Sequence, residues 1–414
     1  FHFIARPSKL GWSEALSTLT LALFAPWIFF WPHVGVGGFY SDNWAGLLQM
    51  RGDLGSLPLA GAFECFSPSQ VLDNPVGCAS YRLAYSLAGE NGHVWAALTL
   101  VLVGTAIWTF YLALRTARLP PFLAAAPPAL VLVFDGADSS RMWYMVSALV
   151  GLTLFFLGLL IGARACSAAT RLGGVSLALV TWLSLASSAA SYQTIAPLVF
   201  GAPIYFYWAS RRLLRSVAIG GVGLVAIAVI ILQRATGSGR VVGYNFGETL
   251  ERIHQVVTGA AANWSSSFLG FSAPILACAA VLLVPTCIAF ILTSDGGRSM
   301  WLHATVLLVG GILISVLGVA AFIPSEEYYV PRMIGIDNRM NIASQFGYAL
   351  LATALVAYVA VIVWRVSGLR WPAFILGGVI LCLMGSQALE RSLWNQEKWE
   401  SSWRQQVVVL STID

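Results

Sequence analysis

Apolar segments long enough to cross a lipid bilayer recur along the whole chain, and they constrain its fold more than any other feature. Runs of about 18 or more apolar residues match the length of a helix that spans a hydrocarbon core about 30 Å thick. In lipid the backbone of each segment must satisfy its own hydrogen bonds, so we expect helices. Strand-length alternation does not occur in the sequence, which excludes a barrel. The sequence therefore predicts an all-α, polytopic transmembrane helix bundle.

Composition agrees with this class. The chain is 58% hydrophobic and 10% charged, with a mean hydropathy of +0.78, whereas soluble domains carry about 25% charged residues. We predict about eleven spans from the apolar runs. They cover residues 16–33, 93–114, 120–134, 143–162, 172–190, 192–209, 216–232, 273–293, 301–323, 345–364 and 370–388.

The loops between these spans differ in charge, and the difference predicts their side. Cytoplasmic loops are enriched in Lys and Arg. If the N-terminus is inside, the short loops all fall on the cytoplasmic side, where Glu14 and Asp295 are the acidic residues among twelve basic ones. The long segments 34–92, 233–272 and 324–344 then lie outside, together with the C-terminus. We therefore expect function on the outer face of the cell (inner) membrane, the periplasmic or extracellular side.

The predicted organisation is one membrane domain, residues 1–388, which includes the outer loop 34–92. Residues 389–414 repeat Trp near helical spacing among charges, a pattern that favours a helix at the membrane interface. The same residues are also compatible with the start of a soluble outer domain. Because the sequence begins with Phe1 rather than Met, we expect residues before it.

Two of the six cysteines lie in the first outer loop, Cys65 and Cys78. An oxidising compartment favours their pairing, so we predict a disulfide between them, with two free buried thiols as the alternative. The other four lie in spans or an inner loop, where cysteine commonly serves as a packing residue.

Asp42 is the first candidate for chemistry. It follows the first span in an aromatic-rich segment, where partial desolvation raises the basicity of a carboxylate. Such a carboxylate suits a general base for an acceptor hydroxyl. Ser41, Asp42 and Asn43 also form good N-cap material for a helix, which is the structural alternative. Asp53 is a second candidate farther along the same loop.

The sequence gives little support for a metal site. Asp135 and Asp138 sit in a tight outer turn and could begin a divalent cation site, but no third ligand is evident, and turn chemistry explains them better. The five histidines are scattered, without the Cys/His spacing of zinc sites. We therefore predict no cofactor, and leave a bound divalent cation as the alternative.

The layout of the chain resembles the GT-C glycosyltransferases, polytopic enzymes that use polyprenyl-phosphate sugars on the non-cytoplasmic face. The matching stretches are Tyr40–Trp44, Tyr81–Leu83 and Ser191–Gln193, within a first span, a long outer loop and many spans with short basic inner loops. Two departures occur: Asn43 stands where many members have a second acid, and Tyr192-Gln193 stands where some have Tyr-Glu. The acid–base role thus rests on Asp42 alone.

The resemblance implies a polyprenyl-phosphate-linked sugar donor, a glycan or glycolipid acceptor, and inversion at the sugar. It also implies an outer-face arginine for the donor phosphate, since a guanidinium grips phosphate oxygens in two places. The candidates are Arg339 and Arg332, with Arg82 and Arg141 behind them, and Tyr192 and Gln193 beside the substrate. The alternative for Arg332 and Arg339 is ion pairing with nearby acids.

Two other function classes stay open. A lipid or polysaccharide flippase or transporter needs polar groups inside its spans, and the predicted mid-span regions hold no Asp, Glu, Lys or Arg. A non-catalytic subunit of a membrane complex is the third class. A polymerase or ligase would be a variant of the glycosyltransferase class. The expected surroundings are membrane lipids, and we expect no nucleic-acid partner.

Overall fold

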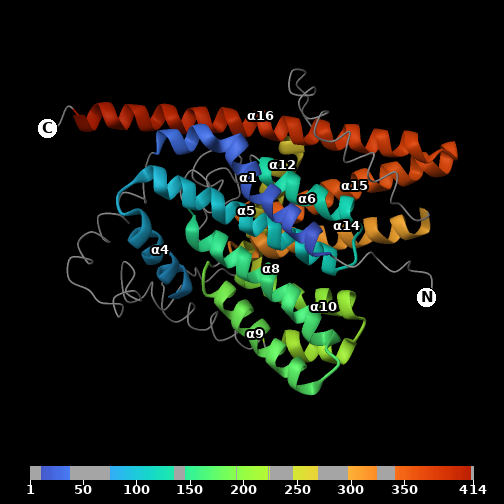
Figure 1. Ribbon diagram of the computed structural model, residues 1–414. Coiled ribbons are helices and arrows are strands. Elements are labelled where there is room, and N and C mark those ends of the chain that lie inside the picture. The colour runs from blue at the N-terminus through green and yellow to red at the C-terminus, as the bar shows by residue number, and fades with distance from the viewer. Residues whose placement is uncertain are drawn as a thin grey trace.

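The computed structural model describes residues 11–37, 75–134, 145–192, 194–221, 223, 246–268, 297–323 and 341–411 (Figure 1). These residues form helices joined by short turns, and they contain no β-strand. The predicted all-α class is confirmed for this part of the chain.

The helices in chain order are α1 (Trp12–Val36), α4 (Pro75–Ala88), α5 (Gly92–Thr116), α6 (Pro121–Val133), α8 (Val146–Ser167), α9 (Arg171–Ala189), η3 (Ala196–Gly201), α10 (Ala202–Ser210), α12 (Phe246–Phe268), α14 (Gly297–Ala320), α15 (Ser344–Ser367) and α16 (Arg370–Ser411). Residues 213–221 are also helical. Among the described helices, seven are long and apolar enough to cross a membrane: α1, α5, α8, α9, α14, α15 and α16. A multi-pass membrane protein follows from them.

These seven helices overlap seven of the predicted spans, but one prediction is wrong. Residues 192–209 do not form one spanning helix: a turn at Tyr192 leads into the 6-residue 3₁₀-helix η3, which is followed by the 9-residue α10. Pro197 and Pro203 explain the break, because proline lacks the N–H that a continuous helix needs. Predicted span 120–134 is the 13-residue α6. Spans 216–232 and 273–293 extend beyond the described residues, so the total of eleven stays a prediction.

The core of the bundle lies where α5, α8 and α15 meet. Phe110, Phe156 and Phe346, one from each helix, are fully buried, and their ring centroids are 4.8 to 5.0 Å apart. Tight aromatic packing of this kind adds to the dispersion energy of the core. The other long helices cover this core and expose apolar side chains such as Leu21, Leu183 and Val309 to the outside, as expected for surfaces that face lipid.

Small residues allow α14 and α15 to pack closely along their length. A methyl group at Gly311 would lie 2.9 Å from Leu351, and one at Gly318 would lie 2.6 Å from the backbone of Ser344. Gly347 approaches Ser315 in the same interface. Membrane helices lack a hydrophobic driving force for association, so close backbone approach at small residues is a usual source of stability.

The two ends of the bundle can be assigned from contacts between helix termini. Arg115 at the end of α5 pairs with Glu14 at the start of α1, whereas His93 at the start of α5 contacts Val34 at the end of α1. Trp208, at the end of α10, donates to the carbonyl of Ala117. The end with Glu14 and Trp208 is the one that the sequence predicts as cytoplasmic, and we call it the inner end; the opposite one is the outer end. Which of the two ends faces the cytoplasm stays a prediction.

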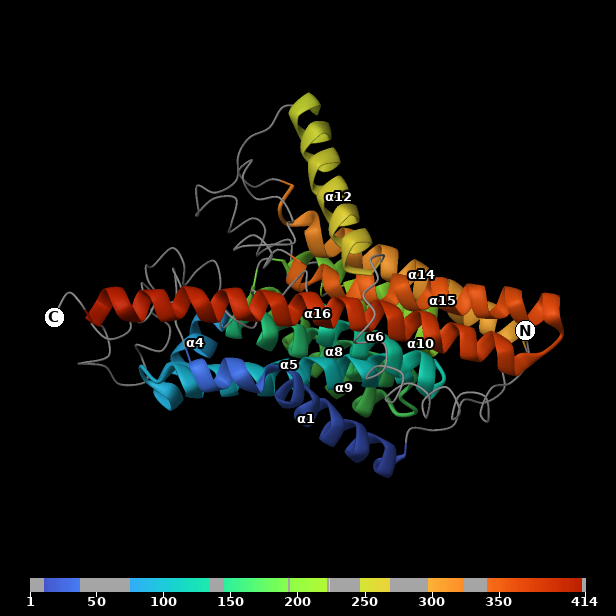
Figure 2. The same cartoon turned by 90° about the horizontal axis from the view of Figure 1, so that it is seen from above.

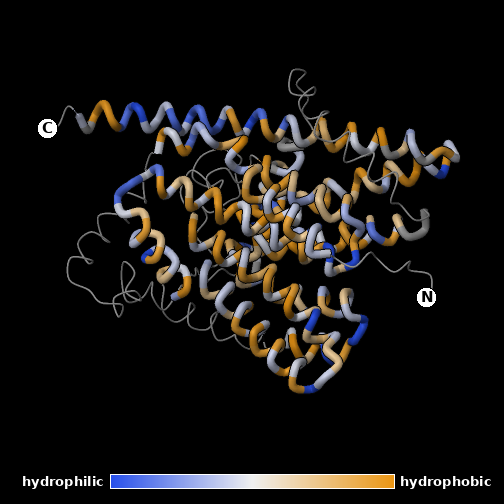
Figure 3. Tube along the Cα trace, in the orientation of Figure 1, coloured by the Kyte–Doolittle hydropathy of each residue, from blue (hydrophilic) through white to orange (hydrophobic). Residues whose placement is uncertain are grey.

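Helix α16 is far longer than one span. Its 42 residues reach about 60 Å, twice the thickness of a hydrocarbon core, and it runs along the whole bundle (Figures 1 and 2). The predicted boundary at residue 388 falls inside this helix without a break. Figure 3 shows its first half richer in hydrophobic residues and its second half richer in hydrophilic ones. The second half is therefore helical, as its Trp spacing suggested, and its place at a membrane interface stays a prediction.

Candidate functional site

The candidate site lies at the outer end, where the structure describes part of the predicted set. Arg82 and Cys78 lie on α4, and Tyr192 follows α9. The remaining candidates fall outside the described residues: Asp42, Asp53, Cys65, Arg141, Gln193, Arg332 and Arg339. Their predicted roles stay predictions.

Helix α4 has one buried and one exposed side. Gly77, Cys78 and Arg82 are buried, while Leu83 and Leu87 are exposed. The two leucines are four residues apart and so share one face of the helix. This amphipathic pattern explains why a segment that is too short and too polar to span a membrane still packs against the bundle.

The buried side of α4 contacts the end of α9. Gly77 N donates to the carbonyl of Ala190 over 3.5 Å. A methyl group at Gly77 would collide with the carbonyl oxygen of Ser191 and lie 3.2 Å from Ser147 on α8. Only a residue without a side chain permits this approach. It places the start of α4 against the 190–192 junction, although the two segments are more than 100 residues apart in the sequence.

Two of the stretches that carry the family resemblance therefore belong to one region. Tyr81–Leu83 is on α4, and Ser191–Gln193 includes the junction that α4 contacts. Tyr192 is half-buried and packs on the core. The ring centroid of Tyr81 lies 6.4 Å from that of the buried Trp95 at the start of α5. Arg82 is 6% exposed. Burial weakens solvent screening around a guanidinium, which strengthens its interaction with any anion that reaches it.

The base of the predicted outer loop 34–92 is closed by direct contacts. His93 Nδ1 donates to the carbonyl of Val34 over 2.6 Å, and Gly92 packs against the backbone of Gly37. Asn91 caps α5 by accepting from the backbone N–H groups of His93 and Val94. The first and last residues of this loop are therefore neighbours. In the sequence, Asp42 comes five residues after Gly37.

A second group of buried polar residues lies at the start of α15, next to predicted loop 324–344. Asn341, Ser344 and Gln345 are all buried, and Ser344 donates to the carbonyl of Asn341. Gln345 donates to the carbonyl of Ile342. Buried polar groups require such bonds because their desolvation is costly. These residues hold the beginning of α15 in place where that loop returns to the bundle.

Arg252 was not among the predicted candidates. It lies on α12, is 2% exposed, and donates to the carbonyl of Phe322 over 3.4 Å. The signal for its burial was present in the sequence: Arg252, Val256 and Ala260 recur every four residues, which puts the arginine on the apolar side of an amphipathic helix. Figure 2 shows α12 projecting from the side of the bundle.

The predicted disulfide and the possible cation site both include residues outside the described part of the chain. Cys78 is buried, and the free cysteines of the described residues are Cys166 and Cys382. Its predicted partner Cys65 lies outside these residues, so the bond stays a prediction. Among the described residues, no cluster of His, Cys, Asp and Glu could hold a metal; Asp135 and Asp138 lie outside them.

Comparisons with protein families and with curated proteins find no match for this chain. Its function must therefore be inferred from its residues and its fold.

Proposed function

We propose that this protein is a GT-C-type membrane glycosyltransferase that transfers a sugar from a polyprenyl-phosphate donor to a glycan or glycolipid acceptor at the outer end of the bundle. The observation that carries the proposal is the contact of Gly77 with Ala190 and Ser191. It joins the Tyr81–Leu83 and Ser191–Gln193 stretches, which resemble the same family independently. The seven candidate membrane helices supply the setting that a lipid-linked donor requires.

The proposed reaction is an inverting displacement. The Asp42 carboxylate accepts the proton of the acceptor hydroxyl while that oxygen attacks the anomeric carbon of the sugar. The bond between the anomeric carbon and the phosphate oxygen breaks, and polyprenyl phosphate leaves with its electron pair. Arginine stabilises the charge of this leaving group by donating two hydrogen bonds to phosphate oxygens. Arg339 and Arg332 are the first candidates, followed by Arg82 and Arg141.

The distribution of charges favours an enzyme over an ion-coupled transporter. In six of the seven candidate membrane helices, α1, α5, α8, α9, α14 and α15, the charged residues lie near the helix ends, as Glu14 and Arg115 do. Helix α16 has one charged residue at its start and carries the others in its second half, from Glu390 onward, beyond predicted span 370–388. Charges inside a membrane are costly and usually mark a transport pathway. A flippase without ion coupling and a non-catalytic subunit remain the alternatives.

Two measurements on the purified protein, sugar transfer and movement of the donor across vesicle membranes, separate these functions. The purified protein is incubated with a polyprenyl-phosphate sugar and a mixed pool of glycan and glycolipid acceptors, and the release of free polyprenyl phosphate is measured. We expect release that depends on both substrates. A flippase would move the donor across vesicle membranes without consuming it. A non-catalytic subunit would do neither.

A further inference from the structure

Five arginines gather at the inner end around two turns, and the proposed transferase does not use them. Arg164 and Arg171 flank the turn between α8 and α9, and Arg211, Arg212 and Arg215 lie around the turn after α10. All five are exposed. We call them the inner arginine cluster. In Figure 3 the tube is hydrophilic at the lower right, where α8 meets α9 and α10 ends.

Contacts with α8 hold two of these side chains together. Nη1 of Arg212 and Nη1 of Arg215 donate to the same acceptor, the carbonyl oxygen of Cys166, over 3.3 and 3.2 Å. Arg215 also donates to the carbonyl of Ala168 over 3.0 Å. These carbonyls end α8, where cations are favoured. A guanidinium carries five N–H donors, and these bonds use only Nη1, so both groups keep donors for a further anion.

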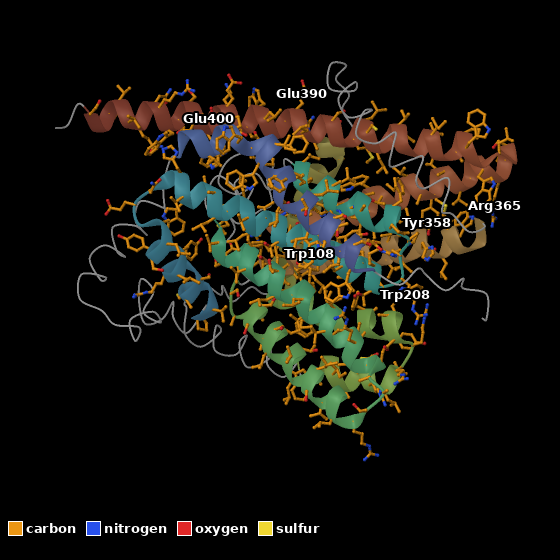
Figure 4. The ribbon with its side chains drawn as sticks, viewed as in Figure 1. Trp108, Trp208, Tyr358, Arg365, Glu390 and Glu400 are labelled. Atoms are coloured by element: carbon orange, nitrogen blue, oxygen red, sulfur yellow. The ribbon has the colours of Figure 1, made fainter. Side chains whose placement is uncertain are left out.

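Arg211 is held by a different contact. Its guanidinium lies 4.0 Å from the ring centroid of Trp208, which donates in turn to the carbonyl of Ala117. Arg365 lies 5.4 Å from the Trp301 ring, and Figure 4 shows Trp208 and Arg365 at the same side of the bundle. Tryptophan is typical of the membrane interface. The headgroup region of a bilayer is therefore the natural surrounding of Arg211.

No carboxylate of the described chain neutralises the cluster. The sequence contains no Asp or Glu between Asp138 and Glu248. Glu14 lies at the inner end, but it is bound by Arg115 and Tyr111. Charges of one sign held this close repel one another, so a bound anion would stabilise the arrangement.

The surface next to the arginines is apolar and exposed. Leu172 follows Arg171 and is 80% exposed, and Leu214 precedes Arg215 and is 85% exposed. Ile204 and Tyr207 on α10 are also exposed. A free phosphate ion would gain nothing from these side chains, whereas the acyl chains of a lipid would cover them. The chemistry on the surface fits a molecule with an anionic head and an apolar tail.

We propose that the inner arginine cluster binds the headgroup phosphate of an anionic phospholipid, with Arg211, Arg212 and Arg215 as its main donors. Guanidinium groups bind phosphate oxygens in bidentate geometry, and basic pockets between membrane helices bind lipid headgroups. This binding does not depend on the proposed sugar transfer, because it uses the opposite end of the bundle.

The backbone at Arg211 provides a clean variant. Arg211 ends α10 with φ 60°, in the left-handed region, where glycine is normally favoured and other residues are strained. Arg211→Gly therefore removes the guanidinium and relieves strain, so the fold is retained. A triple variant with Arg211→Gly, Arg212→Gln and Arg215→Gln tests the whole cluster. Arg404→Ala is the matched control, since Arg404 is 75% exposed on the far half of α16.

The test is native mass spectrometry of the detergent-solubilised full chain, titrated with phosphatidylglycerol, phosphatidylcholine or inorganic phosphate. We expect phosphatidylglycerol to bind at least about tenfold more tightly than the other two. An interfacial basic residue contributes about fivefold to binding of an anionic lipid surface, so Arg211→Gly should weaken binding about fivefold and the triple variant on the order of a hundredfold. Arg404→Ala should bind like the parent.

Several results would overturn the proposal. Equal binding of the two lipids would show that the headgroup charge is not recognised. Equal binding of inorganic phosphate would show an ion site without a lipid. An Arg404→Ala loss as large as that of Arg211→Gly would show a general charge effect. If the triple variant does not fold, unchanged binding in Arg211→Gly contradicts the proposal by itself.

Discussion

Arg115 and Glu14 form a bidentate ion pair that joins α5 to α1 at the inner end. Nε of Arg115 lies 2.6 Å from Oε1 of Glu14, and Nη2 lies 3.1 Å from Oε2. Tyr111 donates to Oε1, and Nη1 of Arg115 donates to the carbonyl of Leu119. At the other end of the same helix pair, His93 contacts Val34. The helix that precedes the Asp42 loop is thus fixed to α5 at both ends.

The first prediction concerns this ion pair. Glu14→Gln removes the counter-charge of Arg115, whose side chain is 1% exposed. Breaking a buried pair costs about 3–5 kcal/mol, and we expect the lower end because the Glu14 side chain is 25% exposed. Thermal unfolding in detergent measures the loss. Arg404→Gln, which removes the 75% exposed arginine of a 3.9 Å pair with Glu400, should change the stability by less than about 1 kcal/mol. Equal stability of the Glu14 variant and the parent would contradict the structural role.

The second prediction concerns the contact of α4 with α9. Gly77→Ala places a methyl group against the carbonyl oxygen of Ser191, and overpacking of this kind costs about 1–3 kcal/mol. We expect lower thermal stability and reduced donor turnover, because the contact positions α4. Gly221→Ala is the control: nothing lies within 4 Å of a methyl group there. If both glycine variants behave alike, α4 does not pack as described.

The third prediction concerns the predicted bond between Cys65 and Cys78. Peptide mapping without reduction should recover the two cysteines in one linked species, which separates after reduction. Cys166 and Cys382 serve as internal standards, because both are free. Because Cys78 is buried, the protein should be denatured in the presence of the thiol reagent, so that a free Cys78 thiol would be labelled. Quantitative labelling of both Cys65 and Cys78 without reduction would exclude the bond.

The apolar runs predicted the long helices well, because a membrane forces each run to satisfy its own backbone. The apolar runs wrongly predicted one spanning helix at residues 192–209. Hydropathy alone does not take into account that Pro197 and Pro203 interrupt this segment. The apolar runs also could not predict the pairing of Glu14 with Arg115. The charge bias of the loops predicts their side of the membrane but not which helices are neighbours. Hydrophobic periodicity could have revealed buried Arg252. Of the candidate site, the sequence named Arg82 and Tyr192 but could not show that Gly77 joins their two segments.

The fourth prediction concerns the donor phosphate. Arg339→Ala should weaken binding of the donor lipid by at least about tenfold, since charged hydrogen bonds to phosphate contribute more than about 1.5 kcal/mol each. The effect on thermal stability should be small. Binding of fluorescent donor lipid to the purified variants measures this directly. Unchanged binding in both Arg339→Ala and Arg332→Ala would transfer the role to Arg82 or Arg141.

Asp42 is the proposed general base of the sugar transfer, and the activity of Asp42→Asn tests this role. Asp42→Asn keeps the size and the capping ability of the side chain but cannot accept a proton. Sugar transfer by the purified variant should fall about 10²–10⁴-fold, while insertion and donor binding stay normal and Asp53→Asn retains most activity. A cap-only role predicts the reverse, with near-normal turnover in Asp42→Asn and poorer folding in Asp42→Ala. Transfer by Asp42→Asn within a few-fold of the parent would exclude Asp42 as the general base.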